Sequence, residues 1–213
     1  MGKTTASLLT RFTVTNFVVP GHTYNFQVRS RNKWGWSTLS AIKAIKASTW
    51  PNVVDRPITT IDPEDGSVVI TWTKPDFNSS PIDKYIIEIQ NMNNLNTWFQ
   101  DVVYCNGANL IIIELAQCTI PMSQFTDPQL GYELFEPIIV RVTAKNAKGL
   151  SISPSLPSTA SATTKTIPTV MHYNSITRGE TTDEATLDIR WTPLVTASDT
   201  GDSEILSYNL QYD

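Results

Sequence analysis

Two runs of the sequence alternate apolar and polar residues with a period of two. In the first run Tyr24, Phe26 and Val28 share one side of an extended chain, and residues 138–144 repeat the same alternation. Successive side chains of a β-strand point to opposite faces, so each run predicts a strand that buries one face. Similar runs recur between turns rich in Pro, Gly, Asn and Asp, and helical periodicity is weak throughout. The pattern therefore predicts antiparallel sheets.

The alternating runs are parts of a larger internal repeat. One match, offset by 114 positions, has the spacing Asn-x-x-Gly-x-Ser and comprises Asn32, Gly35, Ser37, Asn146, Gly149 and Ser151. A second match, offset by 119, ends in a Trp that precedes a Pro, and it comprises Val68, Ile70, Trp72, Leu187, Ile189 and Trp191. A third match, offset by 123, comprises Ile82, Tyr85, Ile87 and Ile89 with Ile205, Tyr208, Leu210 and Tyr212. The larger offset reflects an insertion in a polar turn, where extra residues are tolerated.

The repeat of roughly 115 to 120 residues divides the chain into three parts. Residues 1–50 are predicted to be the last strands of one domain, and residues 51–164 a complete domain. Residues 165–213 are predicted to be the first strands of a third domain. The predicted fold class is all-β, with immunoglobulin-like antiparallel β-sandwiches in tandem and one complete domain flanked by two half-domains.

The order and spacing of these motifs resemble the fibronectin type III family. That family has a Trp that ends its second strand, a Tyr in its third strand, a tyrosine corner, and a Gly-x-Ser turn before its last strand. Trp72 and Tyr85 match this pattern in the complete copy, as do Trp191 and Tyr208 in the third copy, and Tyr24 matches at the corner of the first. The resemblance covers nearly the whole chain. It implies that these five residues are core anchors, because large aromatic side chains dominate sandwich cores.

The middle copy departs from the family pattern at its corner. Ile138 stands where the corner tyrosine is expected, and the segment that precedes it is longer than a usual corner. The hydrogen bond from a corner tyrosine to nearby backbone is therefore predicted to be absent. A disulfide between Cys105 and Cys118 is one way in which the same end of the domain could be pinned.

Cys105 and Cys118 are the only cysteines, and they are thirteen positions apart. Two thiols are too few for a structural zinc site. We predict a disulfide that closes a short loop in an extracellular chain, and the alternative is two buried thiols in a cytosolic domain. Residues 78–80 form an N-glycosylation sequon in a predicted turn, so Asn78 is a candidate glycosylation site.

A candidate surface follows the strand predicted at Tyr24, Phe26 and Val28. Arg29 and Arg31 point away from the apolar face of their strand, and Trp34 and Trp36 follow in the next turn. Stacking of a guanidinium on either ring is predicted, with a contribution of about 0.5–1 kcal/mol at an exposed site. Residues 36–40 also look like the Trp-Ser-x-Trp-Ser box of cytokine receptors, with Leu39 in place of the second Trp. We interpret the cluster as surface stabilisation or an interdomain contact.

Composition excludes several other classes of function. Charged residues make up 17% of the chain, the net charge is −4 and no basic patch stands out, which argues against a nucleic-acid partner. No apolar run approaches the roughly 20 residues that span a bilayer, so direct membrane insertion is not predicted. His22 and His172 are the only histidines, and neither has a nucleophile or a metal-ligand cluster beside it. No catalytic, cofactor-binding or metal-binding residue is predicted, and the chain is not expected to be an enzyme.

The half-domains pose a question about partners. Each would expose an apolar face and unpaired strand edges. In one explanation the chain is an internal segment of a longer array that supplies the missing strands. In the other, the C-terminal half of one molecule is completed by the N-terminal half of the next. The predicted partner is therefore a protein, either a second copy or neighbouring domains of the same array.

The predicted function is structural or adhesive. We expect a segment of an extracellular or cell-surface array, in which head-to-tail assembly would build a filament or a coat. One alternative is a receptor ectodomain that binds a protein ligand. Another is a cytoplasmic or ciliary scaffold with reduced cysteines.

Overall fold

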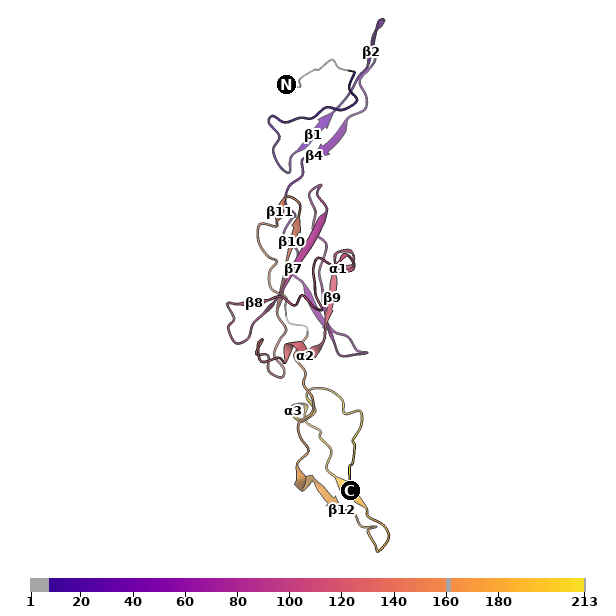
Figure 1. The fold of residues 1–213 in the computed structure, drawn as a ribbon, viewed down its shortest axis with the longest axis vertical. Helices are drawn as coiled ribbons and strands as arrows, with labels where there is room; N and C mark the ends of the chain where they lie inside the picture. Colours follow the sequence, from indigo (N-terminus) through magenta and orange to yellow (C-terminus); the bar gives the residue numbers. More distant parts are fainter. Residues whose placement is uncertain (1–7, 160–161, 213) are drawn as a thin grey trace.

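The computed structural model describes residues 8–159 and 162–212, which form an elongated molecule of three parts (Figure 1). The N-terminal and C-terminal parts lie at opposite ends, and the central part lies between them. The described strands pair in antiparallel fashion, and the helices are short. The predicted all-β, immunoglobulin-like antiparallel fold is confirmed.

The central part is a sandwich of two sheets. The three-stranded sheet has the order β5 (Ile58–Ile61), β6 (Val68–Thr71) and β9 (Gln117–Ile120). The four-stranded sheet has the order β11 (Gly149–Leu150), β10 (Val140–Asn146), β7 (Ile82–Gln90) and β8 (Trp98–Phe99). Non-consecutive strands are neighbours in both sheets, as expected for the Greek-key connections of an immunoglobulin-like sandwich.

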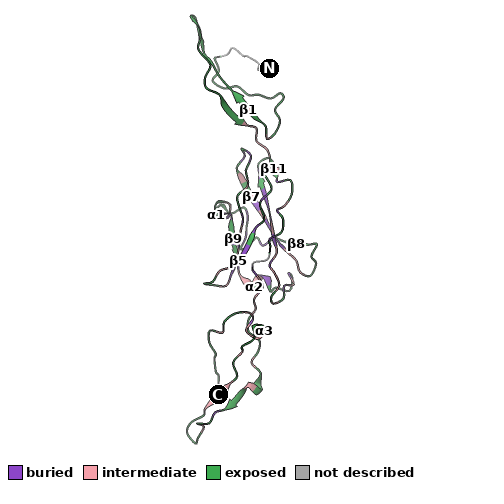
Figure 2. Cartoon of the chain, turned by 180° about the vertical axis from the view of Figure 1, so that it is seen from behind, coloured by how far each residue is buried: buried purple, intermediate pink, exposed green. Residues whose placement is uncertain are grey.

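Alternation of side chains along the strands builds the core of this sandwich. In β7, Tyr85, Ile87 and Ile89 are buried while the residues between them are half-buried. Val68 and Ile70 of β6 come from the facing sheet and are also fully buried. All of the buried hydrophobic residues of the described chain lie between Val54 and Ala162 and form one cluster, which Figure 2 shows as purple strands in the central part.

Two short helices cross between the sheets of the central part. Helix α1 (Leu110–Leu115) begins where the Asn109 side chain accepts a hydrogen bond from the Ile111 amide, and it ends at Ala116 in a left-handed conformation. Helix α2 (Met122–Phe125) follows β9 directly and buries Phe125 in the core. Helix α1 lies between β8 and β9, and α2 lies between β9 and β10, in the segment of this copy that is longer than expected.

The N-terminal part is a ribbon of short strands. Strand β1 (Thr23–Phe26) pairs with β4 (Lys43–Lys46), and β2 (Arg31–Asn32) pairs with β3 (Gly35–Trp36) in the hairpin between them. Residues 1–50 are expected to supply the last strands of a domain, but residues 8–22, which include Phe12 and Val14, contain no strand. A β-strand needs a neighbouring strand with which to pair. The ladder of β1 and β4 extends into this segment at Gly21 and His22, where Gly21 donates to the Ala47 carbonyl and His22 accepts from the Ala47 amide.

The C-terminal part is similarly open. It contains η1 (Tyr173–Ser175), β12 (Ile176–Arg178), β13 (Ile189–Trp191) and α3 (Ala197–Thr200). Strands β12 and β13 pair with each other and with no other described strand. The predicted strand at Tyr208 and Leu210 is absent, because no neighbouring strand is available to it.

Candidate interdomain and self-association surfaces

The aromatic anchors occupy different environments in the central and C-terminal parts. Trp72 and Tyr85 are buried and meet edge to face, with ring centroids 5.1 Å apart. Burial raises the pKa of the Tyr85 hydroxyl. Trp191 and Tyr208 keep the same partnership at 5.8 Å, but Tyr208 is exposed because no second sheet covers it. The same pair is therefore a core contact in one copy and an open surface in the other.

Tyr24 forms the corner contact that is typical of this position. Its hydroxyl accepts a hydrogen bond from the Val19 amide at 2.7 Å and donates one to the Phe17 carbonyl at 3.0 Å. The His22 ring lies edge-on against it, with centroids 4.8 Å apart. These contacts order residues 17–24 locally, although Tyr24 is only half-buried.

The central part has a different tyrosine at its corner. The hydroxyl of Tyr132 accepts a hydrogen bond from the Ile139 amide at 3.4 Å, and its ring packs edge-on against Phe125 at 5.8 Å. Burial raises the pKa of Tyr132 to about 12. Sequence reasoning missed this residue because it precedes the strand, whereas the corner tyrosine of the first copy lies within the strand.

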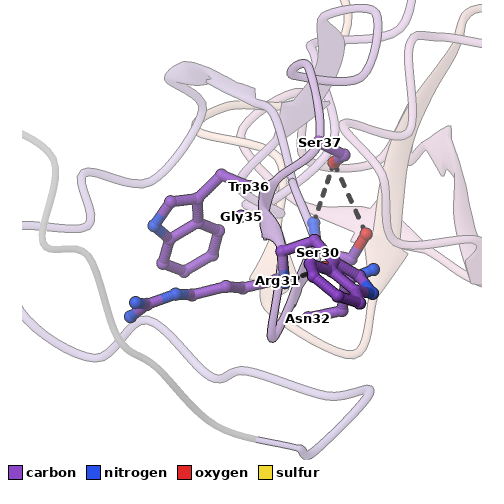
Figure 3. Close-up of a pocket in the computed structure, with 7 residues that line it drawn as sticks. Ser30, Arg31, Asn32, Gly35, Trp36 and Ser37 are labelled. Atoms are coloured by element: carbon purple, nitrogen blue, oxygen red, sulfur yellow. Dashed lines mark hydrogen bonds between the residues drawn. The ribbon is translucent and has the colours of Figure 1, made fainter.

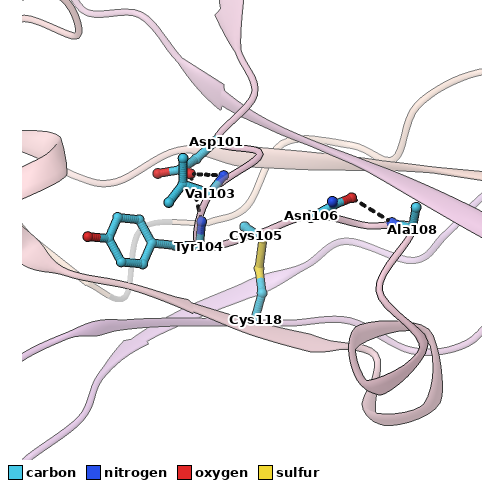
Figure 4. The surroundings of a disulfide bond; sticks show 7 residues. All are labelled: Asp101, Val103, Tyr104, Cys105, Asn106, Ala108 and Cys118. Atoms are coloured by element: carbon cyan, nitrogen blue, oxygen red, sulfur yellow. Dashed lines mark hydrogen bonds between the residues drawn. A yellow bond between two sulfur atoms is a disulfide. The ribbon is translucent and has the colours of Figure 1, made fainter.

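The disulfide joins Cys105 to Cys118 of β9, with their Cα atoms 5.3 Å apart (Figure 4). Asp101 orders the turn before Cys105, because its carboxylate accepts hydrogen bonds from the Val103 and Tyr104 amides at 2.9 Å each. Both cysteines are buried. The bridge fastens the segment between β8 and α1 to the three-stranded sheet, while Tyr132 anchors the corner.

The side-chain nitrogen of Asn78, where a glycan would be attached, is hydrogen-bonded within the protein. It is only 6% exposed, and its Nδ2 donates to the Trp50 carbonyl at 2.9 Å and to Asn52 Oδ1 at 3.0 Å. Attachment of a glycan to that nitrogen would break both hydrogen bonds and displace the backbone around Trp50 and Asn52. The geometry therefore disfavours the candidate glycosylation site.

The Arg and Trp residues of the first copy gather on the β2–β3 hairpin. The guanidinium of Arg29 lies 4.6 Å from the centre of the Trp36 ring, and that of Arg31 lies 5.6 Å from it. Figure 3 shows Arg31 extended along Trp36, with Ser37 bonded to Ser30 behind them. Trp34 instead faces the ammonium group of Lys33 at 4.8 Å and is widely exposed.

The central copy builds a comparable stack from different strands. The guanidinium of Arg141 on β10 lies 4.1 Å from the centre of the Trp98 ring on β8. Strand β7 lies between β10 and β8, and its Glu88 accepts a hydrogen bond from Arg141 Nε at 2.8 Å. The stack thus crosses three adjacent strands on the outer face of the four-stranded sheet. It was not predicted, because its Trp has no counterpart at the Trp36 position.

The junction between the N-terminal and central parts is held by backbone hydrogen bonds. The amides of Thr49 and Asn52 donate to the carbonyls of Asn78 and Asp76, at 3.2 Å and 2.9 Å. Lys46 Nζ donates to the Asn78 side chain at 2.5 Å and pairs with the Asp76 carboxylate at 3.3 Å. The hydrogen bond from the Asn78 amide, and then that from Lys46, hold the pKa of Asp76 below its usual value.

Asn146 closes this junction from the other side. It is almost completely buried at the end of β10, and its Nδ2 lies 2.9 Å from the Thr49 carbonyl. The same nitrogen lies 3.1 Å from each of the Phe77 and Ser80 carbonyls. One side chain therefore connects the linker, the β6–β7 loop and the four-stranded sheet.

The junction between the central and C-terminal parts repeats the same backbone contacts. The amides of Thr166 and Thr169 donate to the carbonyls of Gly201 and Asp199, at 3.1 Å and 2.8 Å. These donors lie 117 positions after those of the first junction, and the acceptors lie 123 positions after theirs. Lys165 again reaches the loop, where Nζ lies 2.8 Å from the Asp202 carboxylate. The extra residues of this copy therefore lie between Trp191 and Asp199, and they do not alter which positions meet.

These surfaces consist of packed side chains and of hydrogen-bonded groups. Among residues 8–159 and 162–212, no group of three or more His, Cys, Asp and Glu residues could hold a metal ion. Within the same residues, no helix is long and apolar enough to cross a membrane. The prominent features are instead the two hydrogen-bonded junctions. The strands of the N-terminal and C-terminal parts also expose large apolar side chains.

Several solved structures of multi-domain proteins are weakly similar to this chain. No protein-family profile matches the chain. A crystal structure of three titin domains is 22% identical over 63% of this chain and 39% of its own, with a TM-score of 0.37. The FN1–FN3 domains of chicken CNTN1 are 20% identical over 70% of this chain and 44% of theirs, with a TM-score of 0.37. The twitchin kinase region from C. elegans is 22% identical over 52% of this chain and 16% of its own, with a TM-score of 0.34. The chain thus spans less than half of each of these structures.

Proposed function

We propose that this chain is a structural and adhesive segment of an extracellular or cell-surface array of fibronectin type III-like domains. Residues 51–164 are the complete domain of the segment, and residues 1–50 and 165–213 belong to its two neighbours. The observation that carries the proposal is the repeated junction. Neighbouring parts meet through equivalent backbone contacts at both ends of the central part, which is the property required of a regular spacer.

The junction contacts support a defined rather than a freely jointed connection. Each linker donates two backbone hydrogen bonds to a loop of the domain that follows it, and a lysine next to the linker binds the same loop. A flexible linker would make none of these contacts. The disulfide supports the extracellular placement, because such bridges persist chiefly in oxidising compartments.

Small-angle X-ray scattering tests the spacer role. The paired substitutions Lys46→Ala and Asn78→Gly remove the contacts that the Lys46 and Asn78 side chains make at the first junction, and Gly suits the positive φ of position 78. We expect the distribution of intramolecular distances to broaden in this variant relative to the unaltered chain. Lys43→Ala is the matched control, because Lys43 is an exposed lysine of the same strand, β4, outside the junction. Identical distributions for all three proteins would contradict the proposal of a fixed junction.

Labelling of intact cells tests the location. Antibodies against the folded central domain should bind cells that have not been permeabilised. Mass spectrometry of a non-reduced digest of the native protein should recover the Cys105–Cys118 peptide pair. Staining that requires permeabilisation, together with two free thiols in the native protein, would instead support the cytoplasmic scaffold.

A further inference from the structure

The disulfide-closed segment of the central part exposes large apolar side chains. Val103 is 81% exposed and Leu110 is 79% exposed, although the strands of this part bury their apolar residues in one core. Six exposed apolar residues lie in helix α1 and in the turn before Cys105, and we call them the loop patch: Val102, Val103, Tyr104, Leu110, Ile111 and Leu115. Apolar side chains that gather on one loop, rather than being scattered singly, mark an interaction surface.

Helix α1 has one side in the core and the other in solvent. Ile112 is buried, and Ile113 packs against the core from a partly buried position. Each residue advances about 100° around a helix, so Leu110, Ile111 and Leu115 share the opposite side. The helix lies beside β9 at the side of the central part (Figure 1). The loop patch therefore belongs to the flank of the elongated molecule.

The segment that carries the patch is held in place by contacts of its own. The disulfide ties Cys105 to Cys118, and the Tyr85 amide donates a hydrogen bond to the Gly107 carbonyl at 3.0 Å. A β-carbon at Gly107 would lie 2.0 Å from the Tyr85 carbonyl oxygen, so this approach requires glycine. The Asn109 side chain caps α1. A surface that is ordered in advance loses little conformational entropy when it binds a partner.

Charge argues against an anionic lipid surface and against a strongly charged partner. Residues 51–164 contain six Lys and Arg against twelve Asp and Glu, a net charge of −6, so anionic lipid would repel this part. Residues 102–113 contain no charged side chain. Next to them Glu114 pairs with Lys74 at 3.6 Å, and both side chains remain widely exposed. The patch thus has one positive and one negative group beside it.

A second copy of the chain complements both groups. In a two-fold contact the same surface of each copy faces the other, so Lys74 of each copy would approach Glu114 of its partner copy. Two attractive pairs would then flank the apolar contact. If each of the six patch side chains exposes roughly 100 Å², two copies would bury on the order of 1,200 Å², the lower end of the range for specific interfaces.

We propose that the loop patch of one chain binds the loop patch of a second chain in a two-fold dimer. The contact is lateral, because α1 lies at the side of the central part (Figure 1). A two-fold contact is closed, so association ends at the dimer. The inference goes beyond the spacer role, which depends on the two junctions and not on this flank.

Analytical ultracentrifugation of the 213-residue chain tests the dimer. We expect a monomer–dimer equilibrium in which the mass does not exceed twice that of the monomer. Ile111→Asp should raise the dissociation constant at least tenfold, because it places an unpaired charge in the apolar contact. An acidic residue suits the first turn of a helix, so α1 should stay folded. Leu95→Asp is the matched control, with an expected change within about twofold, because Leu95 is an exposed apolar residue of the β7–β8 loop outside the patch.

Charge reversal tests the two-fold arrangement. Lys74→Glu and Glu114→Lys each place like charges opposite one another across the interface, so each variant alone should dimerise several-fold more weakly than the unaltered chain. An equal mixture of the two variants brings opposite charges together again and should recover the original affinity. A mixture as weak as either variant alone would overturn the two-fold arrangement.

Three further results would overturn the proposal. The first is a chain that stays monomeric, and the second is self-association that Ile111→Asp leaves unchanged. The third is cosedimentation of a monomeric chain with phosphatidylcholine vesicles that Ile111→Asp abolishes, which would assign the patch to lipid. Near-ultraviolet circular dichroism checks that every variant keeps its fold. None of these results affects the scattering test with Lys46→Ala and Asn78→Gly, so the spacer role and the dimer fail separately.

Discussion

Replacement of Asn146 by Ala is the most direct test of how the central domain holds its linker. The amide has two hydrogens for three carbonyl acceptors, at 2.9, 3.1 and 3.1 Å from Nδ2. Two net hydrogen bonds contribute about 1–3 kcal/mol, and a buried carbonyl left without a donor costs about 1–3 kcal/mol more. These contributions add to about 2–6 kcal/mol, and from the lower half of that range we expect a loss of about 3 kcal/mol in the free energy of unfolding. Such a loss is roughly a hundredfold in the unfolding equilibrium constant.

Urea denaturation of the full chain measures this effect at a concentration where the chain is monomeric. Near-ultraviolet circular dichroism follows the buried aromatic residues, and the midpoint should fall while the slope stays constant. Asn146→Asp keeps the acceptor for the Lys148 amide but removes the donor, so it should be at least as destabilising as Asn146→Ala. Asn32→Ala is the matched control, with an expected loss below about 0.5 kcal/mol in the monomer because Asn32 is exposed. A loss below about 1 kcal/mol in Asn146→Ala would refute the argument that this side chain secures the junction.

Three other perturbations have defined outcomes. Replacement of Cys105 and Cys118 together by Ser should lower the free energy of unfolding by about 3 kcal/mol, since the bridge closes a short loop. Burial raises the pKa of Tyr132 to about 12, against about 10 in the unfolded chain, so about 3 kcal/mol of stability is present below pH 10 and is lost as the pH rises through about 12. Arg141→Ala should cost about 1.5 kcal/mol, and Arg141→Lys about half as much, because the planar group over Trp98 and part of the ion pair are lost.

Each of these outcomes has a measurement that can contradict it. The disulfide effect is read from the urea midpoint of the double variant, and an unchanged midpoint would show that packing alone orders the loop. The tyrosine effect is read from an absorbance titration beside denaturation at each pH, and a single transition near pH 10 for all tyrosines would refute it. Equal stabilities of the Ala and Lys variants would show that the guanidinium plane contributes nothing.

The strands of the central part could be predicted because apolar and polar side chains alternate along them. Alternation along residues 138–144 and the Trp at the end of the second strand predicted buried faces, and Trp72, Tyr85 and Val142 are buried. The strand at Tyr208 and Leu210 was predicted from the same pattern and is absent. The alternation of apolar and polar residues indicates which face a strand would bury. A strand also requires a hydrogen-bonded neighbouring strand, and none of the described strands lies beside Tyr208 and Leu210.

The junctions could not be predicted, since their bonds join backbone atoms and leave little trace in residue type. Thr49 and Thr166 are equivalent donors, but nothing in a threonine indicates that its amide binds a distant loop. The corner tyrosine was missed for a related reason. Tyr132 reaches the Ile139 amide from a segment that the family spacing does not include.

The paired backbone bonds at each linker have a mechanical consequence. Thr49 and Asn52 are three positions apart and both donate to the same loop, so the intervening chain is held at two points. A pulling force along the molecule cannot draw length from this linker until these bonds break. The second linker is fastened in the same way at Thr166 and Thr169. The chain therefore has little slack between its parts, and its first extension under load should come from rupture of these fastenings or of the sheets themselves.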